Sequence, residues 1–141
     1  MIRKHKEQDL EQILDIWNQA SAIAHPFLND AFVEKVAEDM RNMYIPNSET
    51  WVFQEGNIIV GFVSMLENEI AGLFVLPNNQ SKGIGTQLVN FVSKKHSSLE
   101  VEVFEKNSIG RAFYHKCGFK QLKQYAHKES RFNVLRLSIN C

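Results

Sequence analysis

The chain has 141 residues, of which 44% are hydrophobic and 23% are charged, and its formal net charge is zero. This balance predicts one globular domain over residues 1–141 and excludes a disordered or fibrous chain. No apolar run approaches the roughly 18 residues of a membrane span, no secretory signal opens the chain, and 2 cysteines are too few for a disulfide framework, so we expect a cytoplasmic protein without a membrane partner.

A short strand and two helices are predicted at the start of the chain. Residues 1–4 form the strand, and apolar side chains recur at helical spacing through residues 8–21. The chain breaks at Pro26, because proline disfavours helix at the residue before it. Asn29-Asp30 can cap a second amphipathic helix, which we expect to stop at Pro46.

The remainder predicts strands mixed with two helices. β-rich or alternating runs predict strands at residues 50–53, 58–65, 70–76, 99–103, 119–125 and 132–139. Helical spacing predicts helices at residues 86–95 and 108–117. The element order β-α-α-β-β-β-α-β-α-β-β predicts an α/β fold with a mixed sheet and helices on its faces.

The two halves of the chain differ in charge. Residues 1–70 hold 5 Lys/Arg and 12 Asp/Glu, and residues 71–141 hold 11 Lys/Arg and 4 Asp/Glu, which are balances of −7 and +7. The basic half suits an anion and the acidic half a cation, although two solvated faces would show the same difference. The chain lacks the overall basic character of nucleic-acid-binding proteins, so we expect no nucleic-acid partner.

The turn between the strand at 70–76 and the next helix carries the most information. Gly83 and Gly85 leave backbone N–H groups uncovered, and the helix that follows directs its free N–H groups and its positive dipole end at the same point. This predicts a pyrophosphate site. The turn is neither a Walker A loop nor a dinucleotide fingerprint, because it lacks Gly-Lys-Ser/Thr and has Leu88 where the third glycine would stand. A plain strand-to-helix turn with two glycines is the alternative.

Three features resemble the GCN5-related N-acetyltransferase (GNAT) family. Gln80-x-x-Gly83-x-Gly85 is similar to the family's acetyl-CoA signature Q/R-x-x-G-x-G/A, and Leu73-Phe74-Val75-Leu76-Pro77 resembles the strand and exit turn before it. Asn107 followed by Ala112-Phe113-Tyr114-His115-Lys116-Cys117-Gly118-Phe119 resembles the family's second conserved region, although the alanine directly precedes the Phe-Tyr pair, unlike in its common form. The predicted element order matches the family's fold over nearly the whole chain.

The resemblance implies the acyl-CoA N-acyltransferase fold, with the fourth and fifth strands splayed apart around acetyl-CoA. Main-chain groups of the fourth strand would hold the pantetheine arm by strand addition, and the glycine turn would surround the pyrophosphate. The implied cofactor-binding residues are Leu73, Phe74, Val75, Gln80, Ser81, Lys82, Gly83, Ile84, Gly85, Thr86 and Asn107. We expect no metal, because the 5 histidines show no ligand spacing.

The resemblance also implies catalytic and acceptor-binding residues. Tyr114 would be the general acid that protonates the leaving thiolate, the alternative being a core tyrosine. Glu69, which has the spacing of the glutamate in histone-type members, would be the general base. Glu67, two residues earlier, is expected on the same face of the strand and would contact the acceptor. His25 is a further candidate for the base. His25 and Phe27 lie in the loop that shapes the acceptor pocket in similar bacterial proteins. A surface role for the carboxylates and a packing role for His25 are the alternatives.

These features predict an N-acetyltransferase that moves the acetyl group of acetyl-CoA directly to a primary amine. The acceptor is a small molecule or a protein amine, and the protein is a monomer or a homodimer. The alternative function is a non-catalytic acyl-CoA-binding or sensor module on the same fold.

Overall fold

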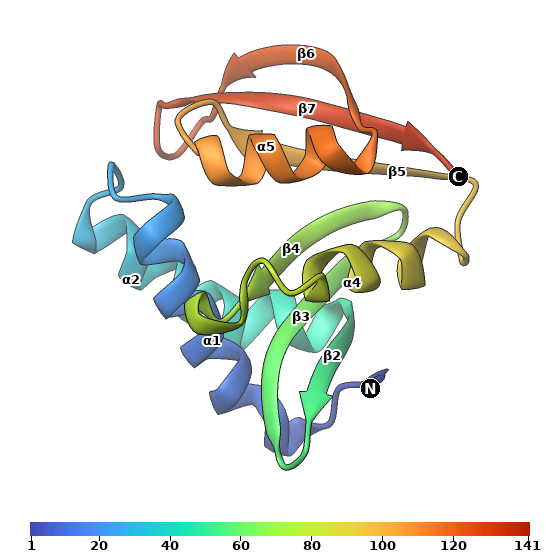
Figure 1. The fold of residues 1–141 in the computed structure, drawn as a ribbon. Helices are drawn as coiled ribbons and strands as arrows, with labels where there is room; N and C mark the ends of the chain where they lie inside the picture. Colours follow the sequence, from blue (N-terminus) through green and yellow to red (C-terminus); the bar gives the residue numbers. More distant parts are fainter.

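The computed structural model describes residues 1–141 and contains a seven-stranded mixed sheet in the order β1-β2-β3-β4-β5-β7-β6 (Figure 1). The strands are β1 (Ile2–Lys4), β2 (Glu49–Glu55), β3 (Ile58–Leu66), β4 (Glu69–Val75), β5 (Ser98–Phe104), β6 (Lys120–Ala126) and β7 (Asn133–Asn140). The longer helices are α1 (Leu10–Ala24), α2 (Asp30–Asp39), α4 (Ile84–Ser93) and α5 (Ser108–Cys117). These principal elements follow the predicted order. None of the helices is both long and apolar enough to cross a membrane.

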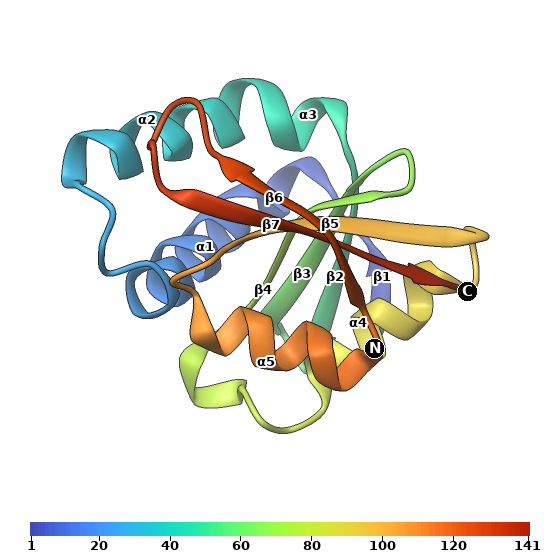
Figure 2. The ribbon, with the colours of Figure 1, turned by 90° about the horizontal axis from the view of Figure 1, so that it is seen from above.

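Alternation along the central strands builds a core on each face of the sheet. Val52 and Phe62 belong to a cluster with residues of α1, whereas Val63, the neighbour of Phe62, belongs to a cluster with residues of α4. Successive side chains of a strand point to opposite faces, so β2 and β3 contribute to both cores. Figure 2 shows the consequence: α1 and α2 lie on one side of the sheet, and α4 and α5 on the other.

The sheet opens between β4 and β5. These two strands run parallel and pair only at Glu69 with Glu100 and at Ile70 with Val101, although β4 continues to Val75. The predicted splay of the fourth and fifth strands is therefore present. It divides the sheet into a part with β1 to β4 and a part with β5 to β7, each fully paired within itself.

The second helical segment continues beyond its predicted stop. After α2 the chain makes a π-helical turn, η2 (Met40–Tyr44), and a short helix, α3 (Ile45–Asn47), that includes Pro46. The helical backbone is continuous there, because Tyr44 and Ile45 keep right-handed helical dihedral angles and the N–H of Ile45 bonds to the carbonyl of Met40. The segment ends at Ser48, whose backbone is extended with a ψ of 162°, so its end lies two residues beyond the predicted stop at Pro46.

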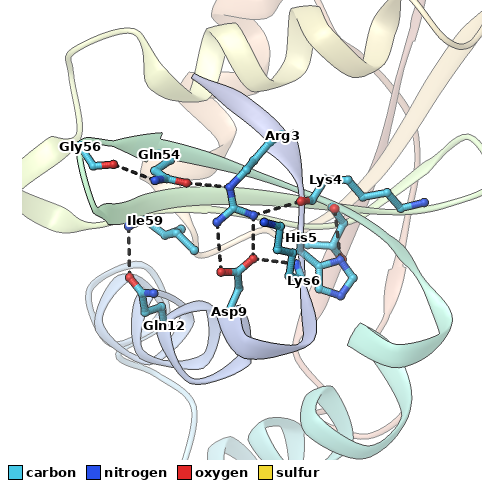
Figure 3. A network of polar contacts seen from close by, with 10 residues as sticks. Arg3, Lys4, His5, Lys6, Asp9, Gln12, Gln54, Gly56 and Ile59 are labelled. Atoms are coloured by element: carbon cyan, nitrogen blue, oxygen red, sulfur yellow. Dashed lines mark hydrogen bonds and ion pairs between the residues drawn. The ribbon is translucent and has the colours of Figure 1, made fainter.

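An ion pair joins the first strand to the start of the helical region (Figure 3). Arg3 donates from its two Nη atoms to the carboxylate of Asp9, at 2.9 and 3.1 Å, and from Nε to Oε1 of Gln54 at 2.6 Å. Asp9, in the 3₁₀ turn η1 (Glu7–Asp9), also accepts from the N–H of Lys6 at 2.7 Å and is buried. The hydrogen bond from Arg3 lowers the pKa of Asp9, so the buried carboxylate stays charged and holds β1, β2 and η1 together.

Candidate active site

A cavity of about 760 Å³ lies between the diverging ends of β4 and β5. Its walls come from β4, the turn before α4, β5, α5 and the C-terminal end of α1. The predicted site residues that line it are Leu73, Phe74, Val75, Gln80, Ser81, Gly83, Ile84, Gly85, Thr86, Asn107, Tyr114 and His25. Four further predicted residues, Lys82, Phe27, Glu67 and Glu69, are not part of its lining.

The glycine turn presents backbone donors at one end of this cavity. Gly83 caps α4 with a φ of 82°, in the left-handed region where glycine is unstrained. The carbonyl of Gly83 accepts its hydrogen bond from the N–H of Gln87 at 3.0 Å. The N–H groups of Ile84, Gly85 and Thr86 therefore have no acceptor within the helix. With the positive end of the helix dipole behind them, these groups can bind a phosphate.

The edge of β4 that faces the cavity is unpaired beyond Ile70. On its other edge, Leu73, Phe74 and Val75 pair with Val63, Phe62 and Gly61 of β3. A strand has N–H and C=O groups on both edges, so half of those in this segment face the cavity, where the carbonyl of Val75 accepts a hydrogen bond from Nε2 of Gln80 at 3.0 Å. An extended chain of amides, such as a pantetheine arm, can pair with these groups as an added strand.

Tyr114 places a phenol at the wall of the cavity. Its ring packs edge-to-face against Phe113 and Phe119, at centroid distances of 5.1 and 5.2 Å, and only 7% of the residue is exposed. Its hydroxyl forms no hydrogen bond with another group of the protein, and burial raises the pKa of the phenol. The phenol therefore stays protonated at neutral pH and can donate a hydrogen bond to a thiolate that forms beside it.

His25 and Asn107 contact each other across the open side of the sheet. The Nδ2 of Asn107 lies 3.2 Å from Nε2 of His25, and Nδ1 of His25 lies 3.0 Å from Oγ of Ser21. The Oδ1 of Asn107 accepts from the N–H of Gly110 at 2.9 Å and caps α5. Burial lowers the pKa of His25 to about 4, so its imidazole is neutral at pH 7.

Phe27 lies behind the cavity wall. Its ring packs edge-to-face against Phe104 at 5.5 Å and Phe132 at 4.9 Å, between centroids. It thereby connects the loop after α1 to the end of β5 and to the loop before β7. In this position Phe27 supports the wall on which His25 and Phe104 lie. Lys82 is an exposed side chain of the glycine turn.

Glu69 and Glu67 line a second, smaller hollow and are not brought together with Tyr114. Glu69 pairs with Nη1 of Arg136 at 2.5 Å, and Nε of the same arginine donates to Glu100 at 2.8 Å. The expectation that Glu67 shares a strand face with Glu69 is wrong, because β4 begins at Glu69 and Glu67 lies in the preceding turn with a φ of 55°.

Glu102 of β5 lines the cavity, although no sequence motif marked it as a site residue. Its carboxylate accepts a hydrogen bond from the hydroxyl of Tyr125. The alternation of buried Val101 and Val103 with the charged residues of β5 shows which face Glu102 occupies. The sequence does not show that this face of β5 borders the opening beside β4, because this depends on the order of the strands in the sheet. Glu129, before β7, is a second carboxylate of the lining.

Known proteins are similar to this chain in sequence and in fold. Residues 46–121 match the family model described as acetyltransferase (GNAT) domain. The peptidyl-lysine N-acetyltransferase YiaC of Escherichia coli K12 is 33% identical over 120 residues, 84% of this chain and 82% of YiaC. YjaB of Salmonella typhimurium, also named a peptidyl-lysine N-acetyltransferase, is 28% identical over 84% of this chain and 82% of its own.

Solved structures agree with these matches. The apo form of YjaB from Escherichia coli superposes with a TM-score of 0.88 at 25% identity, covering 98% of this chain and 95% of YjaB. The PaiA N-acetyltransferase of Thermoplasma acidophilum, in complex with coenzyme A, superposes with a TM-score of 0.79 at 18% identity, covering 100% of this chain and 98% of PaiA.

Proposed function

We propose that this chain, which belongs to the GNAT acetyltransferase family, transfers the acetyl group of acetyl-CoA directly to the side-chain amine of a lysine in a peptide or protein. The family match and the relative at 33% identity confirm the predicted family and the N-acetyltransferase activity. The lysine acceptor is supported by the names of YiaC and YjaB. We further propose that residues 1–141 form one catalytic domain.

The observation that carries this proposal is the cavity that joins a cluster of free backbone donors to a buried phenol. The turn from Gln80 to Thr86 would hold the pyrophosphate, with Lys82 as a mobile positive charge beside it. The unpaired edge of β4 would hold the pantetheine arm. This arrangement would deliver the thioester to the part of the cavity wall that carries Tyr114.

In the proposed reaction the lysine amine attacks the acetyl carbonyl carbon, and the C–S bond then breaks. The backbone N–H of Val75 would stabilise the oxyanion, because Phe74, like Leu76, directs its N–H to β3. The hydroxyl of Tyr114 would give its proton to the departing thiolate and regain one from solvent, while the substituted nitrogen loses its second amine proton to solvent as the amide forms. A lysine ammonium has a pKa of about 10.4, so a base must first remove a proton. We assign this role to Glu102, directly or through water, with Glu69 as the alternative.

The wall opposite α4 has the character that a lysine side chain needs. Phe32, Phe104 and the ring of His127 supply aromatic surface for the four-carbon stem, whereas Glu102 and Glu129 supply negative charge for the ammonium group. Neither the aromatic surface nor the negative charge is complementary to a bulky or anionic acceptor.

The test uses the purified chain with acetyl-CoA and a peptide that has one lysine and a blocked N-terminus. We expect thiol release that depends on the peptide and a gain in peptide mass of one acetyl group. A matched peptide with arginine in place of the lysine serves as the control. Coenzyme A binding without any thiol release in the presence of peptide or small amines would support the sensor module, and release with small amines alone would exclude the peptidyl acceptor.

A further inference from the structure

The two parts of the sheet are connected by a side-chain hydrogen bond on the open side of the cavity. At the closed side, β4 and β5 are joined by two backbone register pairs. At the open side, His25 follows α1 in one part and Asn107 precedes α5 in the other, 82 positions apart in the sequence, and the two side chains meet at 3.2 Å. Both residues line the cavity.

The neighbours of Asn107 determine the orientation of its carboxamide. The N–H of Gly110 can only donate, so the atom that faces it is the oxygen Oδ1, and Nδ2 faces His25. A Cβ built on Gly110 would lie 2.5 Å from Nδ2 and 3.0 Å from Cγ of Asn107. The carboxamide therefore packs directly against the backbone of the first turn of α5, which leaves it little room to rotate.

The orientation of Asn107 in turn determines the tautomer of His25. Nδ2 of Asn107 carries only hydrogens, so Nε2 of His25 must be the acceptor. The proton of the neutral imidazole then resides on Nδ1, from which it is donated to Oγ of the buried Ser21. Both ring nitrogens are occupied, which makes His25 unsuited to take a proton during acetyl transfer.

A carboxamide has two N–H groups, and His25 engages one of them. The second makes no hydrogen bond within the protein, and Asn107 lines the same cavity as the unpaired edge of β4. We propose that His25 is a positioning residue, which holds the carboxamide of Asn107 so that its second N–H donates to an amide carbonyl of the pantetheine arm. This inference rests on the proposed function, because it needs coenzyme A in the cavity.

Two substitutions separate this role from simple packing. His25→Phe keeps an aromatic ring against Phe27 and Phe104, which lie 5.9 and 5.1 Å away between centroids, but removes the acceptor. Asn107→Ser keeps a hydroxyl that can cap α5 but removes the donor to His25 and to the cofactor. His115→Phe, on an exposed residue of α5 outside the cavity, is the matched control.

The experiment measures the dissociation constant of coenzyme A by calorimetry for wild type, H25F, N107S, the double variant and H115F. We expect H25F to weaken binding about tenfold, the effect of losing one positioned hydrogen bond, and H115F to leave it unchanged. The double variant should bind as N107S does, because His25 acts only through Asn107. Unchanged affinity in H25F, or the same tenfold loss from H25F in the N107S background, would overturn the proposal.

A second measurement needs neither a variant nor a ligand. Nitrogen chemical shifts of the imidazole in the free wild-type protein report which nitrogen carries the proton. We expect protonated Nδ1 and unprotonated Nε2 at pH 7, and the opposite tautomer would overturn the proposal. Wild type that shows the expected tautomer but does not bind coenzyme A would refute the proposed function, and with it the positioning role, whereas binding with unaffected H25F refutes the positioning role alone.

Discussion

Gly85 lies directly against the ring of Phe113, so that a Cβ added to the glycine would be 3.0 Å from Cε1 and 3.1 Å from Cζ of that ring. The first turn of α4 and the middle of α5 approach each other this closely at the wall of the cavity. The second glycine of the Gly-x-Gly turn is therefore needed for helix packing as well as for access to the backbone donors. Gly83 differs, because its Cβ position is open and its φ of 82° is what requires glycine.

We expect Gly85→Ala to lower the free energy of unfolding by about 1–3 kcal/mol, because Phe113 must move aside to make room for the methyl group. Gly83→Ala should cost about 1 kcal/mol through backbone strain alone. Urea unfolding measures both. In a Phe113→Leu background the cost of Gly85→Ala should shrink while that of Gly83→Ala should not, and an unchanged cost at Gly85 would contradict the packing role.

Tyr114→Phe should lower kcat by about 10²-fold or more while leaving coenzyme A affinity within about twofold, because only the proton donor is removed. The hydroxyl has no hydrogen-bond partner in the protein, so the melting temperature should not fall. Initial rates with the lysine peptide and calorimetry with coenzyme A give the two values. A variant with wild-type kcat would exclude Tyr114 as the acid.

Glu102→Gln and Glu69→Gln should affect different properties. Glu102 lines the cavity, so its substitution should lower kcat by roughly tenfold or more and raise the KM for the lysine peptide. Glu69 is paired with Arg136 outside the cavity, so its substitution should lower the free energy of unfolding, by up to about 1 kcal/mol, with kcat near that of wild type. A large loss of kcat in the Glu69 variant alone would identify that residue as the base.

The stability of the protein should depend on the protonation of His25. Its pKa is about 4 in the folded protein and 6.5 in the reference state, so the unfolded chain binds more protons between these values. The free energy of unfolding should therefore rise with pH through this interval, by up to about 3 kcal/mol. The contribution is fully present above pH 6.5 and is lost as the pH falls toward 4.

His25→Gln removes this titration, so urea unfolding at several pH values should show a smaller slope for the variant across the same interval. Carboxylates such as Asp9 are common to both proteins and cancel in the comparison. Equal slopes for wild type and variant would show that His25 is not buried as a neutral group.

The candidate site was predictable wherever the signal is local in the chain. The phosphate-binding turn depends on residues that are neighbours in the sequence. The motif Gln80-x-x-Gly83-x-Gly85 contains Gly83, the free N–H donors that follow it and the start of α4. Tyr114 was predictable from the sequence motif around it. Glu102 was missed because it lines the cavity only where β5 diverges from β4 beyond Val101, a relation between two strands that are separated by α4 in the sequence.

Local signals in the sequence suffice to predict the order of the principal elements, because periodicity, proline, glycine and capping residues act over a few positions. Which polar groups contact each other depends on the tertiary structure. His25 and Asn107 share no local pattern, and Glu69 pairs with Arg136 from a strand at the other end of the chain. Such pairings depend on strand order and on where the sheet opens, which arise from packing two cores against one sheet and cannot be read from the spacing of residues along the chain.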